Sequence, residues 1–349
     1  MNVTLVAGTR PEIIKMASVI DNLQKKRDVE VTYVHSGQHY DYELSKKFIE
    51  EMNLPKPDFW IDLYYSDPAD QMAELIKKLR EVFSKEKVSL VLFQGDTNTT
   101  LAAALAANKL GIPIGHIEAG LRSNDFRMPE EFNCRLADHL SLLLFAPTQK
   151  SYENLLKESV WGEIYVTGNT VIDAVTRFYP IAKEKSRILE KIPFEEFILF
   201  TAHRAENVDN PIILREFVSF LIESPIPVVY PVHPRTLKRL KEYNLWDKLK
   251  NTKHILLLPP VGYLDILVLM KNARLIITDS GGIVEEATAP QIRKPVLIAR
   301  LSTERPEAIE HGFAKLAGVI KSSLLEHTKY ILENYNEIIK KPPPKITIW

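Results

Sequence analysis

Several short motifs in this chain place glycines, cations or carboxylates directly after an apolar run. The run Leu275-Ile276-Ile277 leads into Asp279-Ser280-Gly281-Gly282, an order that predicts a buried strand, a tight turn and a helix start. The backbone N–H groups of such a turn favour an anion such as a diphosphate. Glu286, one turn into the helix, could reach a ribose hydroxyl, and Arg305 adds a guanidinium after the next strand. The alternative is an ordinary strand-to-helix turn with a Ser or Asp cap.

A second motif of this kind follows the first apolar run. It reads Gly8-Thr9-Arg10-Pro11-Glu12, with Lys15 one turn further on. Proline at a first helical position marks a helix start, and Arg10 and Lys15 could both face a phosphate there. The same residues could equally be solvated charges on a capped helix.

Three carboxylates are candidate acids or bases. Asp96 follows a very apolar segment, in the motif Gln94-Gly95-Asp96-Thr97. It could be a functional acid or a helix cap. Glu118, inside His116-Ile117-Glu118-Ala119-Gly120-Leu121-Arg122, is expected to be partly buried, and a buried carboxylate needs a partner or a task. Glu130 and its neighbour Glu131 begin a helix at its positive end, where acids also serve simply to complement the dipole.

Histidines follow two later strands. His203 could donate to a phosphate oxygen or act as an acid. His233, after the next strand, is more often structural in such a place. Gln38 and His39 lie in a polar turn with no catalytic arrangement of their own.

Strands and helices alternate throughout, which predicts α/β architecture with parallel sheets. Because ligands bind outside the carboxyl ends of strands in such sheets, the polar clusters suggest a cleft between two facing, doubly wound domains. The predicted domains cover 1–170 and 171–334, with a tail over 335–349 that packs back on the first. The expected strands are Val3–Ala7, Val29–His35, Leu90–Gln94, Ile114–Ile117, Leu142–Pro147, Ile164–Thr167, Phe197–Phe200, Pro227–Val232, Ile255–Leu258, Arg274–Thr278 and Pro295–Ala299.

The composition sets broad limits. A chain of 349 residues suggests two domains. Its 45 basic and 45 acidic residues do not favour nucleic acid or membrane as a partner, and its single cysteine fits a reducing, cytoplasmic compartment. The chain lacks a Gly-x-Gly-x-x-Gly motif, a Gly-Lys-Ser/Thr loop, a His-Glu-x-x-His motif and paired cysteines, so we expect no cofactor and no metal.

Together these motifs resemble the non-hydrolysing UDP-N-acetylglucosamine 2-epimerases. The resemblance runs in order through most of the chain, from Gly8-Thr9-Arg10-Pro11-Glu12 to Thr303-Glu304-Arg305-Pro306-Glu307. It implies a GT-B fold of two Rossmann-like domains, UDP bound mainly by the second domain, interconversion of UDP-GlcNAc and UDP-ManNAc, and a cytoplasmic homodimer.

The resemblance also assigns roles by position. The catalytic group comprises Asp96, Glu118, Glu130 and His203; the UDP contacts are Arg10, Lys15, His203, Ser280, Gly281, Gly282, Glu286 and Arg305; and Gln38, His39 and His233 match a regulatory second site of bacterial members. The chain departs from the pattern at Cys134 (usually Arg), at Ala205 (usually Arg) and at His233-Pro234-Arg235-Thr236 (usually His-x-Asn-Pro). The first departure could alter the positioning of Glu130, and the others put allosteric activation in doubt.

Inversion at C2 of an N-acetylhexosamine removes a proton that no adjacent carbonyl acidifies. Expulsion of UDP from C1 with loss of that proton gives 2-acetamidoglucal, which then takes a proton on the opposite face as UDP adds back. Donors at the leaving diphosphate lower the barrier, and two faces need two acid/base groups. Glu118 and Asp96 are expected to handle the proton, with Glu130 orienting or relaying. A hydrolysing 2-epimerase that releases ManNAc, a GT-B glycosyltransferase and a nucleotide-sugar sensor are the alternatives.

Overall fold

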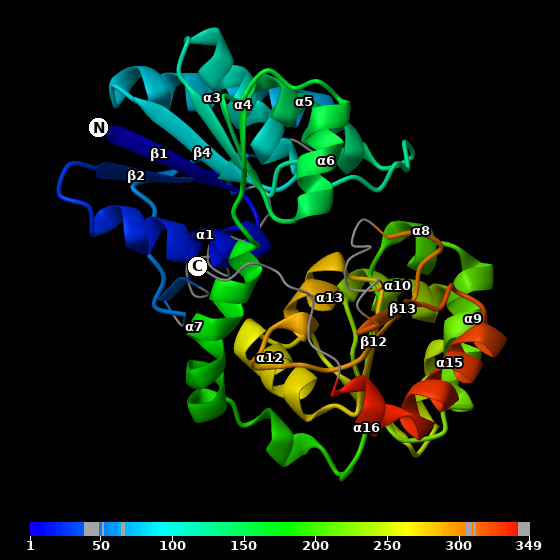
Figure 1. Ribbon diagram of the computed structural model, residues 1–349. Coiled ribbons are helices and arrows are strands. Elements are labelled where there is room, and N and C mark those ends of the chain that lie inside the picture. The colour runs from blue at the N-terminus through cyan, green and yellow to red at the C-terminus, as the bar shows by residue number, and fades with distance from the viewer. Residues whose placement is uncertain (38–48, 51, 64–66, 304–308, 310–311, 341–349) are drawn as a thin grey trace. The chain divides into compact units, whose positions relative to one another are not determined.

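The computed structural model describes residues 1–37, 49–50, 52–63, 67–303, 309 and 312–340. The chain divides into two compact units between Ala174 and Val175. Both units are α/β, and all the strand pairs of the described residues are parallel. Figure 1 shows the helices and strands of each unit.

The first unit is built on a seven-stranded sheet of order β3-β2-β1-β4-β5-β6-β7. Its strands are β1 (Asn2–Ala7), β2 (Glu30–His35), β3 (Phe59–Trp60), β4 (Leu90–Gln94), β5 (Ile114–Ile117), β6 (Leu143–Ala146) and β7 (Glu163–Val166). Its helices are α1 (Arg10–Gln24), α3 (Pro68–Lys85), α4 (Asn98–Lys109), α5 (Pro129–Leu140), α6 (Gln149–Lys157) and the start of α7 (Thr170–Lys185).

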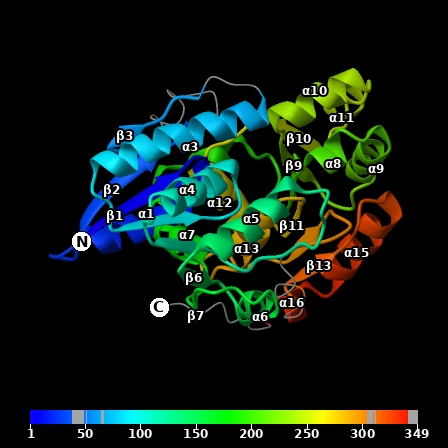
Figure 2. The same cartoon turned by 90° about the horizontal axis from the view of Figure 1, so that it is seen from above.

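Helices cover both faces of this sheet, so its central strands are buried on both sides. Figures 1 and 2 show α3, α4 and α5 on one face and α1 on the other. Between α3 and α5, the alanines of α4 are almost wholly buried, because their small side chains let the neighbouring helices approach closely. Asp67 caps α3 by accepting from Ala69 N at 2.8 Å. The apolar face of α3, which includes Leu75, Leu79 and Val82, packs into the hydrophobic core of the first unit.

The second unit contains a six-stranded sheet of order β10-β9-β8-β11-β12-β13. Its strands are β8 (Ile198–Thr201), β9 (Val228–Pro231), β10 (Ile255–Leu258), β11 (Leu275–Thr278), β12 (Val296–Ile298) and β13 (Ala314–Leu316). Its helices are η1 (Ile188–Lys191), α8 (Ala205–Val208), α9 (Pro211–Ile222), α10 (Pro234–Glu242), α11 (Trp246–Lys250), α12 (Tyr263–Asn272), α13 (Gly281–Thr288), α15 (Lys321–Glu333) and α16 (Tyr335–Ile338). In Figure 1, α12 and α13 lie on one side of the sheet and α9 and α15 on the other.

The predicted α/β class and two Rossmann-like sheets are confirmed, and the differences are local. The strands β3 and β13, of two and three residues, were not expected. The last helical segment is interrupted at Asn334, which separates α15 from α16. Tyr335 and Ile338, at the start of the predicted tail, are buried, and Ile338 belongs to the second core. The rest of that tail, from 341, lies outside the described residues.

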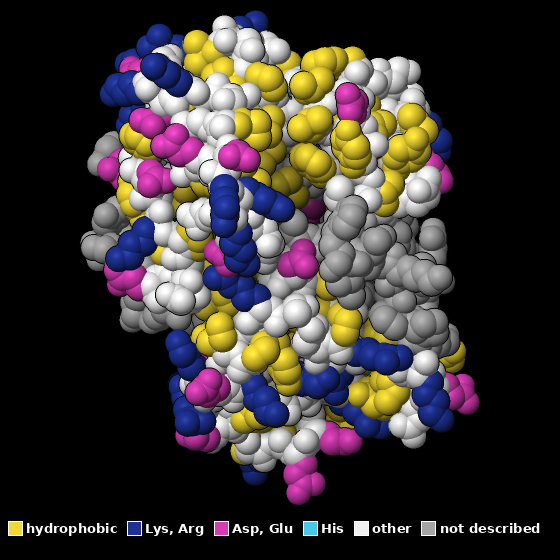
Figure 3. Space-filling model, turned by 60° about the vertical axis from the view of Figure 1, so that its left-hand side comes forward, with side chains coloured by type: hydrophobic (Ala, Val, Ile, Leu, Met, Phe, Trp, Pro, Cys, Tyr) yellow, Lys and Arg dark blue, Asp and Glu magenta, His cyan; other side chains and the backbone are white. Residues whose placement is uncertain are grey.

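The surface carries mixed charge. On the face shown in Figure 3, basic and acidic side chains are interspersed rather than gathered by sign. Of the helices in the described residues, none is both long and apolar enough to span a membrane.

Candidate active site

In each unit the strand order reverses between two neighbouring strands, and the predicted site residues follow those strands. The reversal falls between β1 and β4 in the first unit and between β8 and β11 in the second. Ligands of doubly wound sheets bind outside the carboxyl ends of the strands at this position. Arg10 and Asp96 follow β1 and β4, whereas His203 and Ser280 follow β8 and β11.

Glu118 is the most constrained candidate of the first unit. It directly follows β5, is only 3% exposed and has a φ of +67°, a left-handed conformation that is uncommon for a residue other than glycine. Its Oε1 accepts from Lys15 Nζ at 2.6 Å, and its Oε2 accepts from Gln94 Nε2. Such backbone outliers concentrate at functional sites, where the surrounding structure holds them. The buried ammonium stabilises the negative charge of this carboxylate and fixes its direction.

Lys15 was expected to contact UDP. In the structure it lies in the interior of the first unit, 8% exposed, with its amine on Glu118. Gln94, which also contacts Glu118, was given no role in the sequence analysis. The amide side chain and its position at a strand end were the features that could have indicated a role. The contact with the Glu118 carboxylate, 24 residues away, could not be predicted from the sequence.

The turns after β1 and β4 are joined by Glu12, a second residue to which the sequence assigned no role. One carboxylate oxygen of the buried Glu12 accepts from Gly8 N at 2.8 Å and Thr9 N at 2.7 Å. The other accepts from Thr97 Oγ1 at 2.6 Å. Burial raises the pKa of Glu12 despite these hydrogen bonds. The Thr9-x-x-Glu12 spacing of a capping box was the signal that could have identified it.

Asp96 and Glu130 belong to neighbouring segments. Asp96 is exposed on the turn after β4, and Glu130 is half-buried in the first turn of α5. Asn133 brings these segments together, because its Nδ2 donates to the Asp96 carbonyl at 3.0 Å. Register also aligns the turns of Asp96 and Glu118, since Gln94 pairs with Ile117 in adjacent strands. The structure therefore brings the turns that carry the three predicted carboxylates to one region of the first unit.

Glu131, the neighbour of Glu130, has a structural role. It is 4% exposed, and its Oε2 accepts from the backbone N and the hydroxyl of Ser123, both at 2.8 Å. Its other oxygen meets Arg135 at 2.9 Å. Burial alone would raise the pKa of Glu131, but the hydrogen bonds from Ser123 and the charge of Arg135 outweigh burial and lower it. Of the two adjacent acids, only Glu130 remains a candidate for chemistry.

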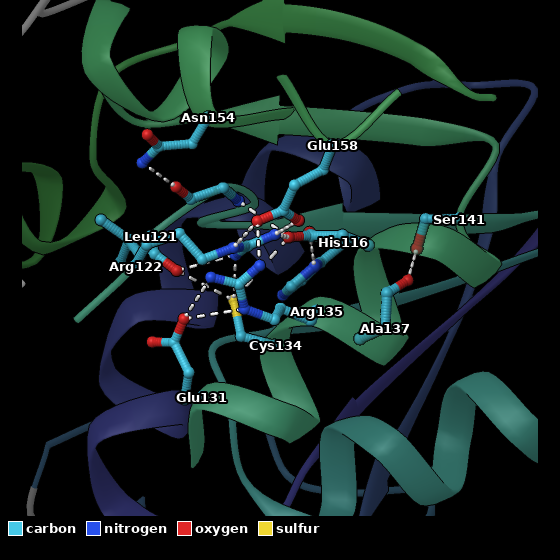
Figure 4. Close-up of polar contacts among 12 residues, drawn as sticks. His116, Leu121, Arg122, Glu131, Cys134, Arg135, Ala137, Ser141, Asn154 and Glu158 are labelled. Atoms are coloured by element: carbon cyan, nitrogen blue, oxygen red, sulfur yellow. Dashed lines mark hydrogen bonds and ion pairs between the residues drawn. The ribbon is translucent and has the colours of Figure 1, made fainter. Parts of the chain in front are cut away.

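A buried ion cluster lies behind these turns. Figure 4 shows His116, Arg122, Glu131, Cys134, Arg135 and Glu158 converging. Arg122 donates to Glu158 Oε1 at 2.9 Å and Oε2 at 2.7 Å, and to Asp138 Oδ2 at 2.6 Å. Sequence reasoning identified His116 and Arg122 as part of a motif, but it did not find their partners on α5 and after α6.

Three members of this region have the ligand types of a metal site. The ligand atoms of His116, Cys134 and Asp138 lie within 4.8 Å of one another. However, Arg122 already donates to Cys134 Sγ at 3.2 Å and to Asp138, so a metal ion would have to displace a guanidinium. Burial, followed by the charge of Asp138, also raises the pKa of the Cys134 thiol, which disfavours the thiolate that metals bind. The described contacts define an ion-pair cluster, and they do not fit a metal centre.

In the second unit the buried carboxylate of Asp279 accepts hydrogen bonds from the backbone of the turn after β8. Asp279 is completely buried and accepts from His203 N at 3.1 Å, Arg204 N at 3.0 Å and Asn207 Nδ2 at 3.1 Å. Burial would raise the pKa of Asp279, but the His203 ring and the further donors lower it. This carboxylate therefore holds the turn after β8 and orients the imidazole, whose Nδ1 lies 3.2 Å from Asp279 Oδ1.

His203 and the first turn of α13 can meet an anion. The His203 side chain is 39% exposed, and with Nδ1 on Asp279 its Nε2 is the nitrogen that can meet a ligand. Ser280 precedes α13, and the N–H groups of the first turn of a helix lack intrahelical partners. Gly282 leaves that turn open, since an added Cβ would meet nothing nearer than Ser280 Oγ at 3.9 Å. Glu286 lies on α13, partly exposed.

Some of the remaining predicted site residues lie outside the described part of the chain, and the others lie at helix starts. Arg305, Gln38 and His39 lie outside the described residues. Arg10 is exposed at the start of α1. His233 caps α10 by accepting from Arg235 N at 3.2 Å, and its ring centroid is 5.5 Å from that of His203. A regulatory role for His233 stays a prediction.

Two doubly wound parallel sheets, each with polar groups at its switch point, define an α/β protein with two Rossmann-like units. The sequence model of the family described as UDP-N-acetylglucosamine 2-epimerase matches residues 21–344. The chain therefore belongs to the UDP-N-acetylglucosamine 2-epimerase family.

Individual relatives agree with this assignment. The UDP-N-acetylglucosamine 2-epimerase of Methanocaldococcus jannaschii is 42% identical over 341 residues, covering 95% of this chain and 92% of the relative. The crystal structure of the M. jannaschii enzyme in complex with UDP-GlcNAc and UDP matches with a TM-score of 0.89 at 41% identity, covering 99% of this chain and 95% of that one. A UDP-2,3-diacetamido-2,3-dideoxy-D-glucuronate 2-epimerase of Pseudomonas aeruginosa is 36% identical over 335 residues, which span 94% of this chain and 92% of the relative.

Proposed function

We propose that this enzyme interconverts UDP-N-acetylglucosamine and UDP-N-acetylmannosamine without net hydrolysis. Glu118 carries the proposal, because a buried, backbone-strained carboxylate held by Lys15 and Gln94 is suited to proton transfer in one fixed direction. The family and its UDP-GlcNAc-bound relative support the choice of substrate.

The first step breaks the bond between C1 of the sugar and the diphosphate oxygen. The bonding electrons leave with UDP, whose growing negative charge is met by the N–H groups at the start of α13 and by His203. C2 then loses its proton to a carboxylate, and the C–H electrons form the C1=C2 double bond of 2-acetamidoglucal. Electrostatic stabilisation of the leaving group is commonly the largest single contribution to such a barrier.

The second step reverses the first, except that C2 takes its proton on the opposite face of the sugar. A carboxylic acid delivers a proton to C2, and a diphosphate oxygen of UDP bonds again to C1. Glu118 and Asp96 are the proposed proton carriers, and Glu130 orients the sugar or relays a proton. No electron acceptor is consumed, so the sequence of bonds balances without a redox cofactor.

One experiment separates this reaction from its competitors. Pure protein is incubated with UDP-GlcNAc alone in D2O, and the products are followed by NMR. We expect UDP-ManNAc with deuterium at C2. Free ManNAc and UDP would instead indicate a hydrolysing 2-epimerase, and no turnover would favour a glycosyltransferase or a sensor. Because the P. aeruginosa relative is named for a diacetamido glucuronate, that UDP-sugar is the second substrate to assay.

A further inference from the structure

The imidazole of His116 is enclosed by hydrogen-bond acceptors. The side chain is completely buried at the end of β5, where its Nε2 lies 2.8 Å from the Gly95 carbonyl oxygen and its Nδ1 lies 2.7 Å from Asp138 Oδ1. A backbone carbonyl can only accept a hydrogen bond, so Nε2 must carry a proton. The state of Nδ1 depends on whether Asp138 is ionised.

Asp138 is held as a carboxylate. Its Oδ2 accepts from Arg122 Nη2 at 2.6 Å and from Gly120 N at 3.2 Å, and both of these groups are obligate donors. A permanently charged guanidinium and a backbone N–H on the same oxygen favour the ionised form of this buried acid. Since Asp138 Oδ1 is then also an acceptor, Nδ1 of His116 must donate as well.

Charge balance in the cluster favours the same state. Asp138, Glu158 and Glu131 bring three negative charges to this interior, while Arg122 and Arg135 bring two positive ones. A doubly protonated His116 makes the group neutral, whereas a neutral ring would leave it with one net negative charge, although Glu158 and Arg135 are partly exposed. The Phe93 ring, 5.2 Å away between centroids, also contacts the imidazole and contributes no charge.

We propose that His116, donating from both ring nitrogens, forms with Asp138 and Arg122 a positioning unit for the turns that carry Asp96 and Glu118. Through Gly95 the unit holds the turn after β4, and through Gly120 N it holds the turn after β5. Its catalytic consequence rests on the proposed function.

The backbone of both turns explains why they need to be held. Gly95 and Gly120 have φ values of +82° and +80°, and Glu118 lies between them in sequence with a φ of +67°. A residue other than glycine in this region is strained and keeps its conformation only when its surroundings fix it. Small displacements of catalytic groups are costly, with about 1 Å of misplacement reducing a rate by about 100-fold.

The first test asks whether the ring donates twice. In protein labelled with nitrogen-15 at histidine, we expect one imidazole to show two slowly exchanging N–H groups, and His116→Asn to remove both signals. A His116 ring with one unprotonated nitrogen would overturn the proposal. This measurement needs no substrate, so its outcome is independent of the proposed function.

The second test compares His116→Asn and Asp138→Asn with a control, Glu158→Gln. Among the described residues, the side-chain hydrogen bonds of Glu158 are with Arg122 and Arg135, so this variant tests the same ion cluster from the side away from the turns. We expect the first two variants to exchange the amides of Gly95–Asp96 and Gly120–Leu121 faster and to lower kcat by roughly 10- to 100-fold. The KM for UDP-GlcNAc should change little.

The control decides between positioning and general stability. Glu158→Gln is expected to lower the melting temperature, by less than Asp138→Asn because Glu158 is partly exposed, but to leave amide exchange in both turns near that of the parent. If all three variants lose activity in proportion to melting temperature, or if amide exchange in the turns does not change, the positioning unit is refuted. Should the parent protein fail to turn over UDP-GlcNAc, the proposed function fails and the exchange and NMR results still decide this proposal.

Discussion

The two units of this protein use buried carboxylates at their strand ends in different ways. In the first unit, Glu118 is held by an ammonium and an amide from distant segments and has a strained backbone. In the second unit, Asp279 accepts mainly from the backbone and side chains of the turn after β8. The first arrangement holds a charged side chain in one direction, whereas the second shapes a turn around an imidazole. The comparison indicates proton handling in one unit and anion binding in the other.

Neutralising Glu118 is the strongest test of the proton-handling role of the first unit. We expect Glu118→Gln to lower kcat by about 100- to 10,000-fold, because an amide cannot accept the C2 proton. Deuterium incorporation at C2 should fall equally, while the UDP dissociation constant, measured by calorimetry, should stay near that of the parent. Unchanged exchange of the C2 proton would remove Glu118 from its proposed role.

Removal of the cation tests whether the buried pair is an ion pair. Lys15→Met should lower the free energy of unfolding by about 3–5 kcal/mol, because it removes the ammonium that contacts the buried carboxylate of Glu118. The double variant Lys15→Met/Glu118→Gln should regain part of that loss in urea denaturation. A double variant no more stable than Lys15→Met would mean that the charge of Glu118 is compensated elsewhere.

The contribution of Asp279 to the free energy of unfolding should depend on pH. Asp279→Asn is expected to lower the free energy of unfolding by about 1–3 kcal/mol near neutral pH, since buried donors lose a charged acceptor. The pKa of Asp279 is lowered in the folded protein, so its contribution is present above the ordinary value near 3.8 and is lost as pH falls through the lowered pKa. The stability difference between parent and variant should therefore narrow below about pH 4. A difference constant across the acid range would contradict this.

The smallest expected effects come from alanine substitutions at Gly8, in the turn after β1, and at Gly282, at the start of α13. An added Cβ at Gly8 would lie 2.1 Å from Thr99 Oγ1 and 2.4 Å from Ser36 Oγ, so Gly8→Ala should cost about 1–3 kcal/mol of stability. Gly282→Ala meets no such obstacle and should leave the melting temperature nearly unchanged. It should nevertheless weaken UDP binding, because the methyl group would occupy the open start of α13. Equal UDP affinity in Gly282→Ala and the parent would argue against an anion site there.

Much of the fold could be predicted from local pattern. The apolar runs over Val3–Ala7 and Leu275–Ile277 are buried strands, as expected, because helices on both faces demand apolar residues throughout. The strands that were not predicted, Phe59–Trp60 and Ala314–Leu316, are too short to carry a period. They form where an edge of the sheet is available, which is a property of the folded unit.

The candidate site divides in the same way. Sequence alone determined the α/β class, the turns at the strand ends and the residue types that could carry protons or bind a diphosphate, because these depend on neighbouring residues. Only the tertiary structure decided that Lys15 meets Glu118, 103 residues away, that Glu131 rather than Glu130 holds a loop, and that Asp138 joins His116 to Arg122. Such pairings depend on which buried charges the returning chain brings within hydrogen-bond distance, and the order of residues does not encode that distance locally.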